Sequence, residues 1–113
     1  MPTTENLYLY HLTLEPHYQN PANWTDAAAQ IIRNHAEFLD RLGQQGILGL
    51  AGRTQYEPGH PHLFGIAIIK AASLEAAQEI MAGDPAVVNG IQRAAIHPYA
   101  IAINHVHNLI SSP

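Results

Sequence analysis

The sequence predicts an α+β domain of the ferredoxin-like type, in which the order βαββαβ builds a four-stranded antiparallel sheet. Two segments have apolar residues at spacings of three and four, as amphipathic helices do. Four other segments alternate or run apolar, as strands do. The chain has 113 residues, the length of a single domain, and we expect a core of residues 7–103 followed by a tail of residues 104–113.

The first strand and the first helix are marked by a change in periodicity. Residues 7–14, LYLYHLTL, alternate in a way that is typical of a strand. Prolines then interrupt the chain, and Thr25 is suited to cap a helix. From there apolar side chains recur on one stripe as far as Leu42, and Gly43 or Gly46 would end this helix.

The next two strands form a predicted hairpin. Residues 47–54 and 63–71 have strand character, and the segment 56–61 between them contains proline and glycine. Because residues 63–71 are apolar on both faces, we expect this strand to lie in the centre of the sheet.

A second helix and a last strand complete the order. Ser73 is placed to cap a short helix, and Asp84-Pro85 then starts a turn or a short helical piece. The last strand is predicted at residues 94–103, where Pro98 indicates an edge position or a bulge.

The composition indicates that a second copy of the chain covers part of the surface. Charged residues make up only 12% of the chain, against about a quarter in an ordinary domain. Two helices cover one face of a four-stranded sheet, so we expect a homodimer through the open face, as in a dimeric α+β barrel. We expect His11 and His97 on outer strands, where they could line a cavity in this dimer or pack there with a polar tip, as could Tyr8, Tyr10 and Tyr99.

Charge and composition argue against several classes of function. The net charge is −4 and no basic stripe is visible, so we expect no nucleic-acid partner. No apolar run approaches the ~20 residues of a membrane span, and no secretory signal is visible. The chain has no cysteine, which excludes disulfides and thiolate chemistry and fits a cytoplasmic protein. Phosphate-loop, dinucleotide, serine-hydrolase and zinc-protease motifs are also absent from the sequence.

Eight histidines are an unusual number for this length, and two pairs have metal-ligand spacing. His60 and His62 lie in the predicted hairpin turn, and His105 and His107 lie near the C-terminus. Both pairs lack a clear third ligand in the sequence. We therefore expect no metal and no other cofactor.

Three stretches together resemble the YCII-related (YciI-like) family over residues 7–101. They are RNHAEFLDRL at 33–42 with GIL at 46–48, then Gly52, and SLEAA at 73–77 with GDP at 83–85, GI at 90–91 and IHP at 96–98. The resemblance implies the fold predicted above and a shared histidine and aspartate suspected of catalysis, which fall by position on His35 and Asp84. The sequence departs from the family after the second strand, where Gly52-Arg53-Thr54 replaces a common Gly-Pro.

The two candidate catalytic residues each have a structural alternative. His35 lies on the apolar stripe of the first helix, where it could be a core histidine with one hydrogen bond. Asp84 precedes a proline, as an ordinary turn or N-cap aspartate often does. If the two side chains meet, the carboxylate would orient the imidazole as a general acid and base.

The sequence leaves three functions open. The first is an enzyme using this pair for isomerisation, elimination or dehydrochlorination of a small molecule, aromatic compounds included. The second is a non-catalytic small-ligand-binding or accessory dimer. The third is a cofactor-independent monooxygenase of a related dimeric α+β barrel family. A pocket beside His35, with Asp84 in hydrogen-bond reach, would favour the first.

Overall fold

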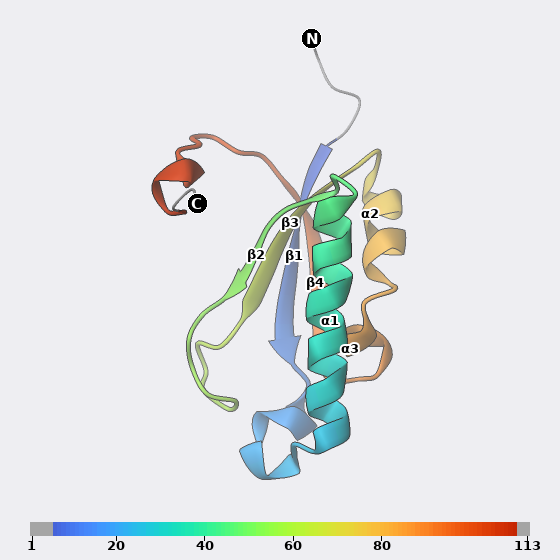
Figure 1. Ribbon diagram of the computed structural model, residues 1–113, viewed down its shortest axis with the longest axis vertical. Coiled ribbons are helices and arrows are strands. Elements are labelled where there is room, and N and C mark those ends of the chain that lie inside the picture. Colours follow the sequence, from blue (N-terminus) through green and yellow to red (C-terminus); the bar gives the residue numbers. More distant parts are fainter. Residues whose placement is uncertain (1–5, 111–113) are drawn as a thin grey trace.

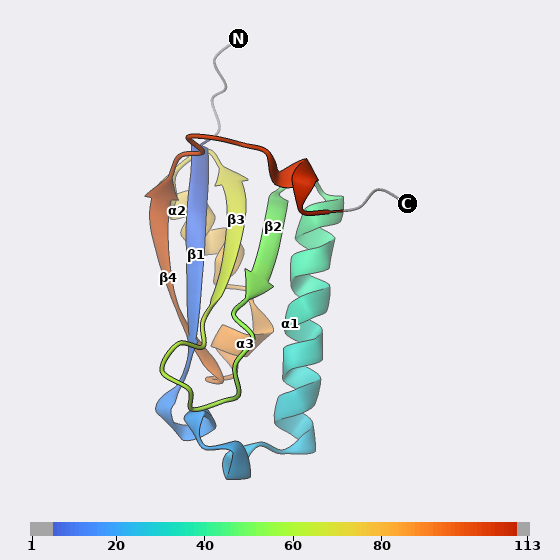
Figure 2. The same cartoon turned by 90° about the vertical axis from the view of Figure 1, so that its left-hand side faces the viewer.

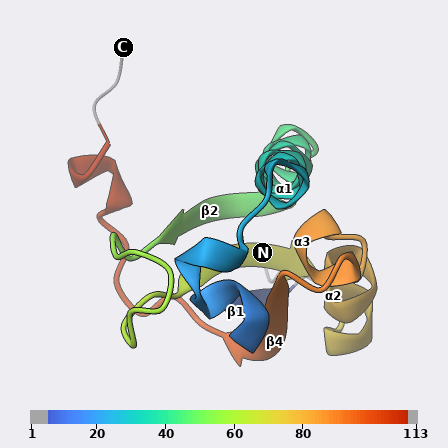
Figure 3. The same ribbon diagram turned by 90° about the horizontal axis from the view of Figure 1, so that it is seen from below.

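A computed structural model describes residues 6–110 as a sheet layer with a helix layer on one of its faces (Figure 1). In chain order the elements are β1 (Asn6–Leu14), α1 (Asp26–Gln44), β2 (Leu48–Arg53), β3 (Gly65–Ala71), α2 (Leu74–Met81), α3 (Pro85–Val88) and β4 (Gln92–Tyr99). Short 3₁₀ turns occupy Pro16–Gln19, Pro21–Asn23 and Val106–Asn108. The sheet is antiparallel with the order β2-β3-β1-β4, so the predicted ferredoxin-like α+β fold is confirmed. Figure 3 shows α1, α2 and α3 on the same side of it.

The helices begin at the residues whose side chains can satisfy free backbone N–H groups. The Thr25 hydroxyl accepts a hydrogen bond from the backbone N–H of Ala28 at 3.1 Å, and the Ser73 hydroxyl accepts from Ala76 at 3.0 Å. Helix α1 ends where Gly46 adopts a φ of +79°, a conformation that glycine takes without steric cost. Both predicted caps are therefore confirmed.

The two faces of the sheet have different environments because neighbouring strand residues point to opposite sides. The face beneath the helices carries the buried side chains of β1 and β3, which are Tyr8, Tyr10, Leu12, Ala67, Ile69 and Ala71. None of the helices within residues 6–110 lies on the opposite face, which is seen in Figure 2. It carries half-buried apolar residues such as Leu9 and Ile68, which are direct neighbours on β1 and β3.

Two expectations about the outer strands are wrong. Strand β4 spans Gln92–Tyr99 instead of residues 94–103. It pairs with β1 from Leu14 back to Leu7, and β1 begins only one residue before Leu7, so β4 has no further partner in β1 beyond that point. Its edge position, which Pro98 indicated, is confirmed. The expected outer-strand position of His11 is also wrong, because β1 lies between β3 and β4.

Two further candidates for the dimer cavity lie on the other side of the sheet. Tyr8 and Tyr10 are buried beneath the helices, because they alternate with the residues of β1 that form the open face. They cannot line a cavity at that face. His11, His97 and Tyr99 do project from the open face. His97 is the cross-strand neighbour of Leu9, which lies on that face, and His11 and Tyr99 each lie two positions along a strand from one of these residues.

The loop between β2 and β3 is fixed by a tight turn at Pro58 and Gly59. The backbone N–H of His60 donates to the carbonyl of Glu57 at 3.0 Å, and Gly59 has a φ of +94°. A Cβ at Gly59 would lie 2.5 Å from the carbonyl oxygen of Gln19. The loop therefore packs directly on the segment that follows β1, and only glycine fits at the contact.

Replacing Gly59 by alanine is expected to lower the free energy of unfolding by about 1–3 kcal/mol, because the residue would be strained and would collide with backbone. The matched control is Gly52→Ala in β2, where a Cβ meets no atom within 4 Å. Chemical denaturation followed by circular dichroism measures both variants. Equal losses of stability would contradict the contact.

Candidate functional site

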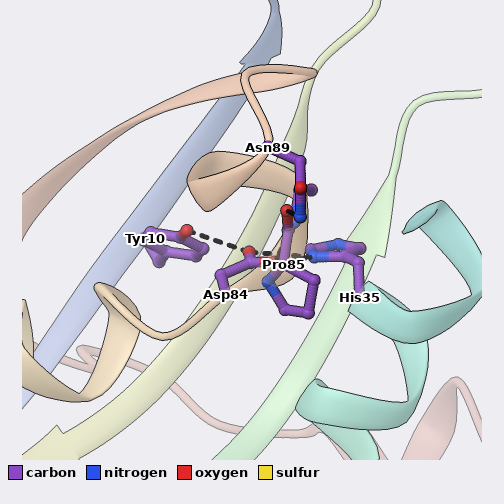
Figure 4. A network of polar contacts seen from close by, with 6 residues as sticks. Tyr10, His35, Asp84, Pro85 and Asn89 are labelled. Atoms are coloured by element: carbon purple, nitrogen blue, oxygen red, sulfur yellow. Dashed lines mark hydrogen bonds and ion pairs between the residues drawn. The ribbon is translucent and has the colours of Figure 1, made fainter. Parts of the chain in front are cut away.

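The structure brings the two predicted site residues into contact. His35 projects from the middle of α1, and its Nδ1 lies 2.8 Å from Oδ1 and 2.9 Å from Oδ2 of Asp84, which immediately precedes α3. Figure 4 shows the imidazole and the carboxylate facing each other, with Tyr10 on the far side of Asp84. The Asp84 side chain has no exposed area, whereas 14% of the His35 side chain is exposed. The histidine therefore lies between a buried acceptor and solvent.

Asp84 accepts hydrogen bonds from three different parts of the fold. Besides His35, the Tyr10 hydroxyl donates to Oδ2 at 2.9 Å, and the backbone N–H of Ala86 donates to Oδ1 at 3.0 Å. The last bond makes Asp84 the N-cap of α3, with Pro85 as the first helical residue. A buried carboxylate needs such partners, since losing its hydration costs several kcal/mol. Asp84 is thus both the expected capping residue and the partner of His35.

Tyr10 is the member of this cluster that sequence reasoning missed as a site residue. It is 1% exposed and lies on the helix-facing side of β1. The pKa of Tyr10 is raised well above its usual range, mainly by burial and secondly by the nearby Asp84 carboxylate. The hydroxyl therefore keeps its proton and donates a hydrogen bond to Oδ2. The signal available in the sequence was a tyrosine on an alternating buried strand face, because a buried phenol needs a hydrogen-bond partner.

The hydrogen bonds define which imidazole nitrogen is available for chemistry. Both carboxylate contacts of His35 are made through Nδ1, and a carboxylate can only accept, so the proton on Nδ1 belongs to this bond. Nε2 makes no hydrogen bond to any residue within 6–110. In the neutral ring Nε2 is therefore a free base, oriented by Asp84.

His35 lines a cleft of about 870 Å³ that is bounded mainly by α1, by β2 and β3, and by the loop that joins these two strands. That volume is within the ~300–1,000 Å³ range of small-molecule sites. Apolar and aromatic side chains form much of its wall, among them Trp24, Ile32, Leu39, Leu48 and Phe64. Arg53, Glu57 and Asp40 add polar groups. The cleft is thus mainly apolar, with a small number of charged groups.

The register of the sheet explains why this cleft is open. Two rows of cross-strand neighbours run from β1 through β3 to β2, and they are Tyr10–Ala67–Ala51 and Leu12–Gly65–Arg53. Cross-strand neighbours point to the same face, so all of these residues lie toward the helices. Ala51, Gly65 and Arg53 of these rows line the cleft, and the first two have little or no side chain to fill the space there.

The other histidine pairs make local contacts instead of a site. The rings of Tyr56 and His60 are stacked with centroids 4.0 Å apart, and His60 Nδ1 accepts from the backbone N–H of His62 at 3.0 Å. His105 and His107 lie at a 3₁₀ turn beyond β4, with ring centroids 6.3 Å apart. Among residues 6–110, no three histidines or carboxylates are grouped as a metal ion would need. Within the same range, no helix has the length and apolar content to cross a bilayer.

The fold and the cluster define a small α+β domain with a tyrosine, an aspartate and a histidine beside a small-molecule-sized cleft. The chain belongs to the YCII family, since the model of the YCII-related domain matches residues 10–99. This match confirms the resemblance found in the sequence. A comparison with curated proteins finds no significant match.

Two solved structures resemble the chain. One is the 5-chloro-2-hydroxyhydroquinone dehydrochlorinase TftG from Burkholderia phenoliruptrix AC1100, in complex with 2,5-dihydroxybenzoquinone. It has a TM-score of 0.55 and 17% identity, over 83% of this chain and 93% of that chain. The other is SnoaB, a cofactor-independent oxygenase from Streptomyces nogalater, with a TM-score of 0.47 and 11% identity over 91% of this chain and 98% of that chain. At this identity, the likeness to TftG supports the fold.

Replacing Tyr10 by phenylalanine is expected to lower the free energy of unfolding by about 1–3 kcal/mol, because the buried Asp84 carboxylate would lose one of its donors. Tyr8→Phe is the matched control, since Tyr8 is buried on the same face of β1 and its hydroxyl bonds to none of residues 6–110. Urea denaturation should separate the two variants. The assigned hydrogen bond would be contradicted if Tyr8→Phe were the more harmful change.

Proposed function

We propose that the protein is a small-molecule enzyme in which His35 and Asp84 perform acid/base chemistry. The observation that carries this proposal is the placement of His35, with Nδ1 held by a fully buried carboxylate while the ring borders the cleft. A histidine that served packing alone would need only one satisfied nitrogen and no adjoining space. A base needs an oriented nitrogen with access to substrate. The bond at Nδ1 supports the first requirement, and the place of His35 in the wall of the cleft supports the second.

The proposed reaction begins with proton removal at Nε2. His35 takes a proton from a carbon or hydroxyl of the substrate, and Asp84 stabilises the imidazolium that results. In an isomerisation the same proton returns to a different atom of the substrate. In an elimination the electrons of the broken C–H or O–H bond form a double bond, and the bond from carbon to a leaving group such as chloride breaks, so that chloride departs with the electron pair of that bond. Neither course needs a metal or a redox cofactor.

The cleft favours a small, largely apolar substrate with a few polar substituents. Trp24 and Phe64 in its wall are suited to contact a planar ring, and Arg53 and Glu57 could bond to hydroxyl or carbonyl groups. A dehydrochlorinase that acts on a hydroxylated aromatic compound shares the fold. We therefore infer that hydroxylated aromatic or quinone-like compounds are the first substrates to test.

His35→Gln is expected to reduce turnover by about 10²–10⁴-fold, because glutamine cannot act as the base. Asp84→Asn should reduce it less, because the base remains but loses its orienting acceptor. The measurement is NMR of a panel of chlorinated and unchlorinated hydroxyaromatic compounds incubated with the protein in D₂O. The spectra report both the products formed by loss of chloride and the incorporation of deuterium into the compounds. His17→Gln, an exposed histidine that does not line the cleft, is the matched control.

The same experiment separates the competing functions. Binding of 2,5-dihydroxybenzoquinone to the wild-type chain without turnover of any compound in the panel would favour a non-catalytic small-ligand binder. Oxygen consumption with a hydroxyaromatic substrate would favour a cofactor-independent monooxygenase. If a folded His35→Gln variant turned over substrate at the rate of the wild-type chain, the acid/base role of this residue would be excluded.

We also propose that the chain is a homodimer joined through the open face of the sheet. That face presents a band of half-buried apolar residues, which include Leu9 and Ile68, and none of the described helices covers it. An apolar sheet face is normally packed against a second layer, and a second copy of the chain supplies that layer by two-fold symmetry.

The chain mass is 12.4 kDa, so the protein is expected to have a mass of about 25 kDa in solution, as a closed two-fold pair would. Size-exclusion chromatography with light scattering at micromolar concentration measures this. Ile68→Glu should shift the protein toward monomer, because a charge would be buried at the centre of the interface. A wild-type monomer under these conditions would contradict the dimer.

A further inference from the structure

The last described part of the chain, residues 100–110, is named here the C-terminal arm. All of its residues are exposed, although several are large and apolar. The exposed fractions are 51% for Ile101, 81% for Ile103, 39% for Val106, 85% for Leu109 and 61% for Ile110. Single exposed apolar residues are ordinary, but five within eleven positions form a concentration that marks an interaction surface.

Within residues 6–110, the hydrogen bonds of the C-terminal arm are made inside the arm itself. Asn104 Oδ1 accepts from the backbone N–H of Val106 at 3.0 Å, and Asn108 and Leu109 donate to carbonyls within the same turn at 2.9 Å. Among residues 6–110, the 3₁₀ turn of the arm makes no close contact with any strand or helix. Figures 1 and 3 show it standing away from the sheet, on the side of the open face.

We infer that the C-terminal arm packs on a second copy of this chain, a conclusion that rests on the homodimer proposed above. The arm leaves β4 directly after Tyr99, whose cross-strand neighbour is Leu7 at the end of the open face. A second copy on that face would occupy the side toward which the arm extends. The arm must then meet the second copy, and two-fold symmetry makes each arm contact the other chain.

The chemistry of the two surfaces agrees with this occupant. Residues 100–110 contain no aspartate, glutamate, lysine or arginine. When the histidines of the arm are neutral, burying it therefore removes no formal charge from water. The middle of the open face is likewise uncharged, with Leu9, His11, Ile66 and Ile68 on its inner strands. A nucleic acid or an acidic peptide would need clustered cations, which neither surface has. A second copy of this chain offers an apolar surface of the required kind.

The test combines arm substitutions with a measured dimer dissociation constant. Replacing Ile103 and Leu109 together by serine should raise the dimer Kd about 100-fold, since two buried apolar side chains contribute roughly a factor of ten each. The control is Val88→Ser in α3, where valine is 67% exposed on the helix layer and the Kd should not change. Sedimentation equilibrium over nanomolar to micromolar concentration measures all three proteins.

A crosslinking experiment identifies the chain that the arm contacts. A photoreactive phenylalanine analogue is placed at Ile103, and ¹⁵N-labelled and unlabelled chains are mixed, exchanged and irradiated. Crosslinked peptides of mixed isotope composition would support the inference, whereas crosslinks confined to one chain would overturn it. A dimer whose Kd is unaffected by the two serines would also overturn it while leaving the dimer intact. A monomeric wild-type chain would instead remove the dimer proposal and this inference together.

Discussion

The buried carboxylate of Asp84 is the constraint on which the arrangement of the site depends. It has no exposed area, so each of its oxygens needs donors from the protein. Those donors come from β1 through Tyr10, from α1 through His35 and from the backbone at the start of α3. Because three elements must meet at one side chain, the position of α1 over the sheet is defined by a polar contact as well as by apolar packing.

This constraint also accounts for the asymmetry of the imidazole. A general base must present a lone pair to the substrate while its other nitrogen carries a proton, and an acceptor that is wholly buried enforces that tautomer. Tyr10 supports the arrangement from behind, since its donated hydrogen bond holds Oδ2 toward the histidine without competing for Nε2. Ala51 and Gly65, which have little or no side chain, line the same cleft as His35.

Much of this could be predicted from local patterns, and the rest could not. Periodicity and caps gave the order of the elements, the stripe position of His35 and the turn position of Asp84. Their contact depends on how α1 packs against α3, and the Tyr10 bond joins residues 74 positions apart, so no local pattern specifies either. The end of β4 depends on where its partner strand begins. The inner position of His11 follows from the strand order of the ferredoxin-like topology, in which the first strand is central, and not from any local pattern.

Strand β1 connects the site with the proposed interface. Tyr10 and His11 are adjacent in sequence, yet one bonds to Asp84 beneath the helices and the other projects from the open face beside Ile66. A shift of β1 by one residue against its neighbours would exchange the two faces, placing a histidine beneath α3 and a tyrosine on the open face. The buried bond to Asp84 opposes that shift from one side of the strand. Packing of a second copy, in the dimer proposed above, would oppose it from the other side, so that both surfaces would stabilise the same register.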